Sequence, residues 1–204
     1  MTTTSTTTSW IQKFEPQLEV LREQDFFEIP DFMSIQEINE LRSQILELKA
    51  QAKFRAATLG AGKQLNSEVR SDQIFWIDET LKASLPALEI YFSQLEELRL
   101  FLNERFFLGL RELESHFSIY SAGTFYQRHL DNSKSINRRK LSLVCYLNSA
   151  WEPSHGGELR IYGEGQNIDV APIAGKLVGF LSSTIEHEVL LSRQERLSLT
   201  SWFS

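Results

Sequence analysis

Hydrophobic positions recur every three or four residues in two stretches of the first half of the chain. Ser34 and Glu37 have the spacing of a capping box before the first stretch, while Ser84, Pro86 and Gly109 suit the start, first turn and stop of the second. The two apolar stripes are Ile35, Ile38, Leu41, Ile45 and Leu48, and Leu88, Phe92, Leu95, Leu98, Leu102 and Phe106. The pattern predicts two amphipathic helices that each face a core.

The period changes in the second half, where short runs of β-forming residues alternate with turn residues. A further apolar run at 74–77 follows a polar loop at 56–72 that contains glycine. The predicted strands of the second half are 116–127, 141–148, 158–163, 167–171, 176–182, 188–192 and 196–203. Short strands at this spacing are typical of a sandwich or barrel, and the preceding helices would cover one of its sheets.

We therefore predict an α+β fold, and the chain length of 204 residues suits one domain. Residues 1–9 are almost entirely Thr and Ser, so we expect a disordered tail there. Residues 10–204 would form the domain, with helical support and a loop in 10–115 and the β core in 116–204.

Composition narrows the possible functions. The chain has 27 acidic and 21 basic residues and a net charge of −6, which argues against nucleic acid as a partner. The N-terminus has no apolar signal segment, and no apolar run approaches the roughly 20 residues that cross a bilayer. Cys145 is the only cysteine, so an internal disulfide is impossible. We expect a cytoplasmic protein without a membrane partner.

A metal site would have to use the four histidines together with carboxylates. His129 and Asp131 are two positions apart, so on an extended strand they would point to one face and could share a cation. His187 lies in a later strand and could add a third ligand. Two histidines and one carboxylate form the ligand set of many non-haem Fe(II) sites. Each residue alone could equally be structural, as we expect for His116 and His155, which have no partner at a useful spacing.

Arg196 begins a strand with regular alternation, so that Arg196, Ser198, Thr200 and Trp202 would share one face. A guanidinium inside a barrel needs an anion, because an unpaired buried charge is costly. It can bind a carboxylate through two parallel hydrogen bonds. The alternative is a surface arginine on an edge strand.

Together these features resemble the Fe(II)- and 2-oxoglutarate-dependent dioxygenases, whose core is a double-stranded β-helix, or jelly roll. The chain is most similar to prolyl hydroxylases of the oxygen-sensing type and their bacterial relatives, through most of residues 50–204. The matching segments are Val69–Ile77, Tyr126–Asn132, Val144–Asn148, Trp151, Gly156–Tyr162, His187–Val189 and Arg196–Phe203. The resemblance implies a jelly-roll core with the N-terminal helices packed on one sheet.

The resemblance also assigns roles to matching positions, and the segment 57–72 would be the mobile finger loop that folds over the substrate. The implied Fe(II) ligands and catalytic centre are His129, Asp131 and His187. The implied contacts to 2-oxoglutarate are Arg196, Tyr146, Tyr120 and Thr200, with Arg196 and Tyr146 at the distal carboxylate. The implied substrate contacts are Tyr126, Arg139, Trp202, Arg70 and Asp72.

The implied activity is hydroxylation of a prolyl residue at C4 in a protein, with a loop of translation elongation factor Tu as a candidate substrate. The enzyme would be a monomer that uses Fe(II), 2-oxoglutarate and O2, with L-ascorbate in support. Asp131 favours hydroxylation, because related halogenases have a small residue there. The basic edge formed by Lys134, Arg138, Arg139 and Lys140 could receive an acidic or backbone-rich peptide, or could be a solvated loop.

Two alternatives remain at this point. A different 2-oxoglutarate oxygenase could act on a free amino acid or another small molecule. A non-catalytic β-barrel could instead bind a metal or a carboxylate as a sensor or interaction module, although an intact metal triad together with Arg196 argues against it.

Overall fold

The computed structural model describes residues 10–58, 66, 68–132, 138–163 and 165–204. The predicted tail at 1–9, most of the tip of the predicted finger loop and Lys134 of the predicted basic edge lie outside the described residues. Within the described part of the chain, no helix combines the length and the apolar character that a membrane crossing would need.

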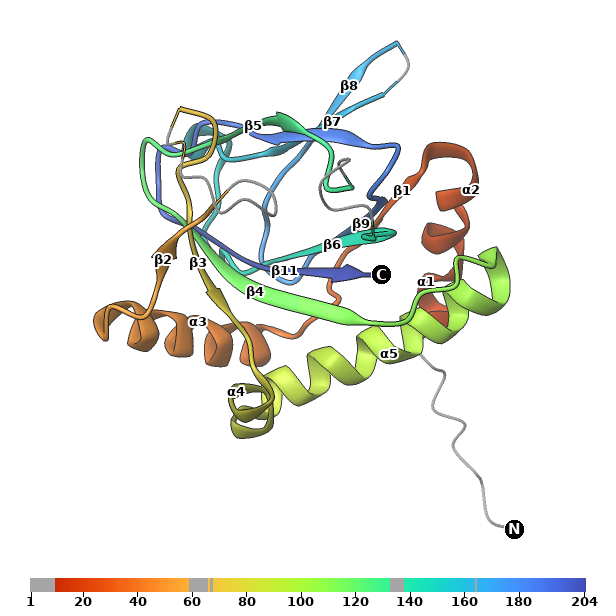
Figure 1. Cartoon of the computed structure of the whole chain (residues 1–204), viewed down its shortest axis with the longest axis horizontal. Helices are drawn as coiled ribbons and strands as arrows, with labels where there is room; N and C mark the ends of the chain where they lie inside the picture. The colour runs from red at the N-terminus through yellow and green to blue at the C-terminus, as the bar shows by residue number, and fades with distance from the viewer. Residues whose placement is uncertain (1–9, 59–65, 67, 133–137, 164) are drawn as a thin grey trace.

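Helices occupy most of the first half of the chain (Figure 1). They are α1 (Trp10–Glu19), α2 (Leu21–Gln24), α3 (Ile35–Ala50), α4 (Glu79–Ser84) and α5 (Pro86–Phe106), and a short 3-10 helix, η1 (Pro153–His155), follows later. The predicted capping box starts α3. The Ser34 Oγ accepts from the Glu37 backbone N–H at 3.3 Å, and the Glu37 carboxylate accepts from the Ser34 N–H at 2.7 Å.

The second predicted helix differs from α5 at both ends. Ser84 ends the preceding helix α4, and Pro86 is the first residue of α5. The helix stops at Phe107, which is left-handed with φ 57°, and not at Gly109. The Asn103 side chain explains this early stop, because it bonds both the N–H and the carbonyl of Leu110 and thereby fixes the exit of the chain.

The strands form two antiparallel sheets in the described residues. The larger has the order β1-β9-β6-β11-β4-β3-β2 and the smaller the order β5-β10-β7-β8. The larger sheet comprises β1 (Phe26–Ile29), β2 (Arg55–Ala56), β3 (Gln73–Trp76), β4 (Leu113–Tyr120), β6 (Leu141–Tyr146), β9 (Leu177–Leu181) and β11 (Arg196–Phe203). The smaller comprises β5 (Tyr126–His129), β7 (Leu159–Tyr162), β8 (Asn167–Val170) and β10 (Glu186–Val189).

Two predicted strands need correction. The run at 116–127 is two strands, because a turn containing Gly123 at φ 86° takes the chain from β4 in the larger sheet to β5 in the smaller one. The run at 188–192 corresponds to β10, which begins two residues earlier, at Glu186, and ends at Val189. The sequence pattern also missed β1, a short strand that pairs with β9 at one edge.

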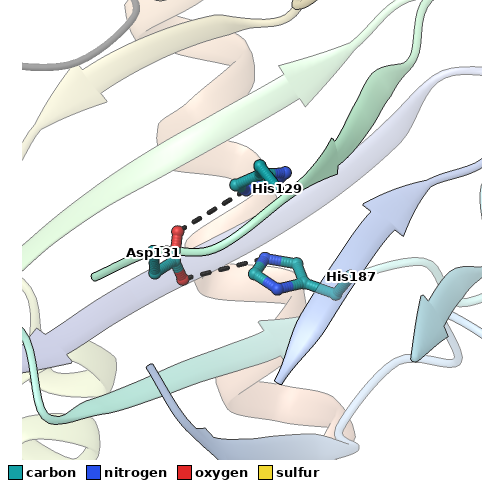
Figure 2. A group of neighbouring side chains, drawn as sticks. All are labelled: His129, Asp131 and His187. Carbon is teal, nitrogen blue, oxygen red and sulfur yellow. Dashed lines mark ion pairs between the residues drawn. The ribbon is translucent and has the colours of Figure 1, made fainter. Parts of the chain in front are cut away.

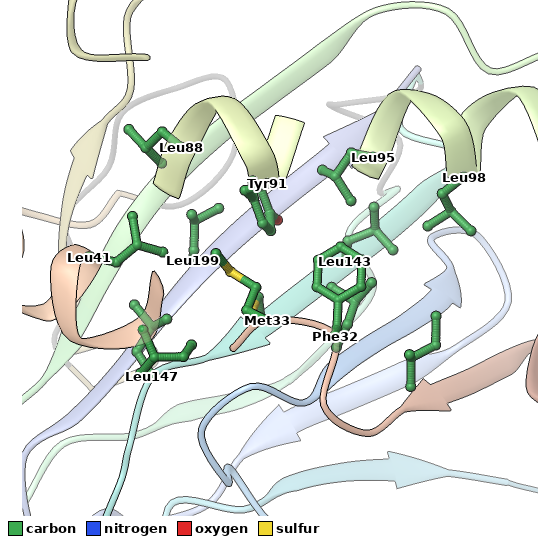
Figure 3. Close-up of a cluster of buried hydrophobic side chains, with 14 of the residues drawn as sticks. Phe32, Met33, Leu41, Leu88, Tyr91, Leu95, Leu98, Leu143, Leu147 and Leu199 are labelled. Atoms are coloured by element: carbon green, nitrogen blue, oxygen red, sulfur yellow. The ribbon is translucent and has the colours of Figure 1, made fainter. Parts of the chain in front are cut away.

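The helices cover one face of the larger sheet, and the smaller sheet covers the other. Figure 3 shows the helix side, where α3 and α5 pack over leucines of β6 and β11. Tyr91 of α5 is fully buried there, and its hydroxyl bonds Ser201 at 2.9 Å. A second apolar cluster joins residues of both sheets, including Tyr146, Leu159 and Phe180. The α+β prediction is therefore confirmed, and the space between the sheets holds the polar residues of the site.

Candidate active site

The three predicted metal ligands converge between β5 and β10 (Figure 2). His129 ends β5 and lies directly opposite His187 of β10, so their side chains share one face of the smaller sheet. Asp131 follows β5 by two residues. Its Oδ1 lies 3.6 Å from Nε2 of His129, and its Oδ2 lies 3.8 Å from Nε2 of His187. The three candidate ligand atoms all lie within 4.8 Å of one another.

Backbone carbonyls orient both imidazoles. Nδ1 of His129 lies 2.8 Å from the carbonyl of Gln127, and Nδ1 of His187 lies 3.2 Å from the carbonyl of Ile185. A carbonyl only accepts, so each Nδ1 carries a proton, and each Nε2 faces Asp131 and is the nitrogen left for a metal. Burial lowers the pKa of His187 to about 4, so this imidazole is neutral at pH 7.

Asp131 is held as a carboxylate. Burial by itself would raise its pKa, but His187, His129 and the hydroxyl of Ser142 together hold the pKa well below its usual range. Its Oδ2 accepts from Ser142 Oγ at 2.6 Å and from Trp202 Nε1 at 2.8 Å. Two imidazoles and one ionised carboxylate form a ligand set that fits a divalent metal such as Fe(II).

Arg196 is a buried cation without an anionic partner. It is 3% exposed, and no carboxylate lies within ion-pair distance among the described residues. Its Nε donates to the Gly157 carbonyl at 2.9 Å and its Nη1 donates to Ser198 Oγ at 3.2 Å. A guanidinium has five N–H groups, so three are left for a ligand. The predicted location on an inner strand face is confirmed, and the alternative of a surface arginine is wrong.

Two tyrosines flank this guanidinium. Its carbon lies 4.8 Å from the ring centre of Tyr120 and 5.1 Å from that of Tyr146. Burial raises the pKa of both phenols, so they are neutral hydrogen-bond donors at pH 7. The Tyr146 hydroxyl is fully buried and has no hydrogen-bond partner of normal geometry in the described part of the chain. A carboxylate bound at Arg196 would supply one.

These residues surround one pocket, which we call the metal-side pocket. The alternation of β11 places Arg196, Ser198, Thr200 and Trp202 in its wall, as predicted, whereas Leu197 belongs to the helix-side core. The polar residues of the wall are Arg70, His116, Ser118, Tyr120, Tyr126, His129, Asp131, His187, Arg196, Ser198, Thr200 and Trp202. The pocket thus combines a metal-ligand set with an unpaired cation, as a ligand with a metal-binding end and a carboxylate end would require.

The residues predicted to contact substrate lie beside this pocket. Tyr126 stacks on His129 with ring centres 3.6 Å apart, and the Arg70 guanidinium lies 4.6 Å from the Tyr126 ring centre. Arg70 binds both oxygens of Asp72, at 2.6 and 2.9 Å. The Asp72 carboxylate is fully buried behind Arg70. The structure therefore places Arg70 at the pocket surface and Asp72 in a supporting position.

A second pocket, which we call the outer pocket, adjoins the first. Trp76, which is 47% exposed, and Arg139 line it together with Trp202 and His116, which line both pockets. The Arg139 guanidinium lies 3.6 Å from a ring centre of Trp202 and donates to Glu114 at 2.7 Å. A peptide in the outer pocket would therefore lie directly beside the metal-ligand set.

His116 is a pocket residue that our sequence reasoning missed. It is 2% exposed and lies between Trp76 and Trp202, with ring centres 5.0 and 5.1 Å away. Burial lowers its pKa to about 3, so it is neutral at pH 7. The alternation of side chains along β4 could have identified it, because this alternation puts His116 on the same face of the strand as Tyr120. His155, in contrast, lies in η1 and accepts from a backbone N–H there, outside the metal-side pocket.

Comparison with known proteins identifies the family. The crystal structure of a Pseudomonas putida prolyl-4-hydroxylase is 36% identical, with a TM-score of 0.83 over 92% of this chain and 96% of that chain. The chain belongs to the prolyl hydroxylase family of 2OG-Fe(II) oxygenases. The model of the 2OG-Fe(II) oxygenase superfamily matches residues 115–204, from β4 to the end of the chain. The predictions of a jelly-roll core and a 2-oxoglutarate-dependent dioxygenase are confirmed at the level of this family.

Two further members of the prolyl hydroxylase family are similar. Prolyl hydroxylase EGLN3 of Rattus norvegicus is 33% identical over 144 residues, which are 66% of this chain and 59% of that protein. A prolyl hydroxylase from Trichoplax adhaerens, in complex with a hypoxia inducible factor peptide, is 27% identical. Its TM-score is 0.85, over 97% of this chain and 94% of that chain. The predicted cofactor and cosubstrates, Fe(II), 2-oxoglutarate and O2, are those of the superfamily.

Proposed function

We propose that this chain hydroxylates a prolyl residue at C4 in a protein or peptide, using Fe(II), 2-oxoglutarate and O2. One observation carries the proposal: the ligand set His129, Asp131 and His187 shares a pocket with Arg196, a buried cation that has no anionic partner among the described residues. The ligand set fits Fe(II), and the cation fits the distal carboxylate of 2-oxoglutarate. When bound, the metal would supply the redox chemistry and the coordination positions for cosubstrate and O2.

The residues around the metal-side pocket would bind and orient. Two N–H groups of Arg196 are bonded within the described residues, and the other three are enough to bind a carboxylate through two parallel hydrogen bonds. Tyr146 would donate its unpartnered hydroxyl to the same carboxylate, and Tyr120 would pack beside it. The apolar part of the pocket wall would exclude water from the cosubstrate, and it is formed by Val144, Leu159 and Val189.

The outer pocket supports a peptide substrate. It opens beside Asp131 and is lined by the exposed ring of Trp76 and by Arg139, groups suited to a proline ring and to backbone carbonyls. All three of the similar proteins reported above also point to prolyl substrates by name. Which protein is hydroxylated is a separate question, and a loop of translation elongation factor Tu is our candidate.

The first experiment tests the cofactor site. Fe(II) and 2-oxoglutarate added without O2 should give the weak visible charge-transfer band of a keto acid bound to the metal. Asp131→Ala should lose this band, and Arg196→Met should require much more 2-oxoglutarate to develop it. Absence of the band in the wild type, or a band unchanged in Asp131→Ala, would contradict the proposal.

The second experiment tests the substrate. Host proteins from cells with and without this gene would be compared by mass spectrometry for one added oxygen atom on proline. We expect at least one modified prolyl site, and succinate release stimulated by the matching peptide. If free proline or another small molecule alone stimulates succinate release, the small-molecule alternative replaces the peptide proposal. The cytoplasmic location, the monomeric state and the support by ascorbate stay predictions.

A further inference from the structure

The two oxygens of the Asp131 carboxylate have different surroundings. Its Oδ2 accepts two hydrogen bonds from neutral donors, Ser142 Oγ at 2.6 Å and Trp202 Nε1 at 2.8 Å. Its Oδ1 has no donor at normal hydrogen-bond distance in the described residues and faces Nε2 of His129 at 3.6 Å. The two oxygens of this carboxylate are therefore chemically different before any metal binds.

The two donors reach Oδ2 because of strand register. Ser142 of β6 lies directly opposite Trp202 of β11, so both side chains leave the same face of the larger sheet. Asp131 arrives from the facing smaller sheet, after β5. The contact thus ties the carboxylate to the sheet across from the two histidines.

Both donors are themselves fixed. Ser142 Oγ lies 2.8 Å from Ser182 Oγ, and both serines are fully buried. The indole of Trp202 is 5% exposed, with the guanidinium of Arg139 over its ring at 3.6 Å and the ring of His116 at 5.1 Å. Neither donor can leave Oδ2 without disturbing this packing, so the orientation of the carboxylate is built into the fold.

We propose that Ser142 and Trp202 are positioning residues that keep Oδ2 of Asp131 out of the coordination shell, so that only Oδ1 binds the metal. The proposal rests on the proposed metal site. An oxygen that accepts two hydrogen bonds has both lone pairs occupied. A carboxylate without these donors can turn and chelate through both oxygens. It would then fill a coordination position that the keto acid or O2 needs.

The test counts water on the metal, using Mn(II) in place of Fe(II). With three protein ligands, an octahedral ion keeps about three waters, and a chelating carboxylate would leave about two. The relaxation of water protons by bound Mn(II) reports this number. We expect the double variant Ser142→Ala/Trp202→Phe to lose about a third of the relaxation per bound Mn(II). We also expect this variant to bind 2-oxoglutarate with a larger dissociation constant at saturating Mn(II).

Matched variants separate positioning from stability. Ser201→Ala removes an equally buried hydroxyl, but Ser201 bonds Tyr91 and Ser115 on the helix side of β11. It should lower the melting temperature and leave the relaxation unchanged. Ser142→Thr keeps the hydroxyl and should keep the wild-type relaxation.

Each outcome has a definite meaning. Unchanged relaxation in the folded double variant overturns the proposal, even if Mn(II) binds more weakly. If the wild type binds Mn(II) and Asp131→Ala does not, the metal site stands independently of that result. If the wild type binds no Mn(II), the metal site fails and the proposal fails with it.

Discussion

Arg196→Met isolates the role of the buried guanidinium. Methionine keeps most of the aliphatic volume but removes a charge that has no anionic partner within ion-pair distance among the described residues. Replacing such a charge by an apolar side chain is neutral or favourable for folding. We therefore expect the variant without cosubstrate to melt at the same temperature as the wild type or higher.

The variant should differ from the wild type in its affinity for the cosubstrate. Two parallel charge-assisted hydrogen bonds from Arg196 to a carboxylate contribute about 3 kcal/mol, so the variant should bind 2-oxoglutarate about 100-fold more weakly. At 100 times its dissociation constant, 2-oxoglutarate stabilises the wild type by about 2.7 kcal/mol, which is about 5–10 °C for a domain of this size. At the same concentration the variant should gain only about 0.4 kcal/mol, or about 1–2 °C.

The assay is thermal unfolding with Mn(II), with and without 2-oxoglutarate. Arg160→Met is the matched control, because Arg160 pairs with Asp169 across β7 and β8 and does not line the metal-side pocket. The control should keep the full shift with 2-oxoglutarate. A full shift in Arg196→Met would refute the assignment of this arginine to the cosubstrate.

Three further predictions concern the fold. The pKa of His116 falls from 6.5 to about 3 on folding, so the unfolded chain binds more protons and stability is lost below pH 6.5. Between pH 7 and 5, the free energy of unfolding measured by denaturant titration should fall by about 2 kcal/mol less in His116→Met than in the wild type. The same pH dependence of this free energy in both proteins would contradict the prediction. Ser34→Ala should cost about 1 kcal/mol and lower the melting temperature by about 2–4 °C; no change would contradict the capping box. Gly179→Ala would place Cβ 2.2 Å from Phe27 and should cost about 1–3 kcal/mol, a cost that Phe27→Leu should reduce.

The sequence predicted the elements whose periodicity is strong. The capping box of α3, its stripe from Ile38 to Leu48 and the alternation of β11 appear in the structure as expected, because burial of one face enforces the period. Ile35, predicted as the first residue of that stripe, is 62% exposed in the first turn of the helix. The prediction of one continuous strand at 116–127 was wrong, because the turn at Gly123, where the chain passes from one sheet to the other, does not interrupt the hydrophobic pattern. β1 was missed because four residues at a sheet edge carry too little pattern to separate them from a loop.

The candidate site was predictable only in part. The metal ligands are recognisable from residue type and spacing, since few side chains can bind Fe(II). Ser142 and His116 are not, because a serine that bonds a carboxylate looks like any other serine in a strand. Their roles depend on the register of the strands and on how the two sheets pack against each other, and neither can be read from the sequence.

The pairing of His129 with His187 has a consequence for unfolding. The ligands come from opposite ends of the β half of the chain, and β6, β7, β8 and β9 lie between them in the sequence. A bound metal would therefore act as a removable cross-link that closes a long loop, comparable in topology to a disulfide. Chelation should open β5 from β10 before the helix-covered sheet is lost, so the protein would come apart in stages once its metal is withdrawn.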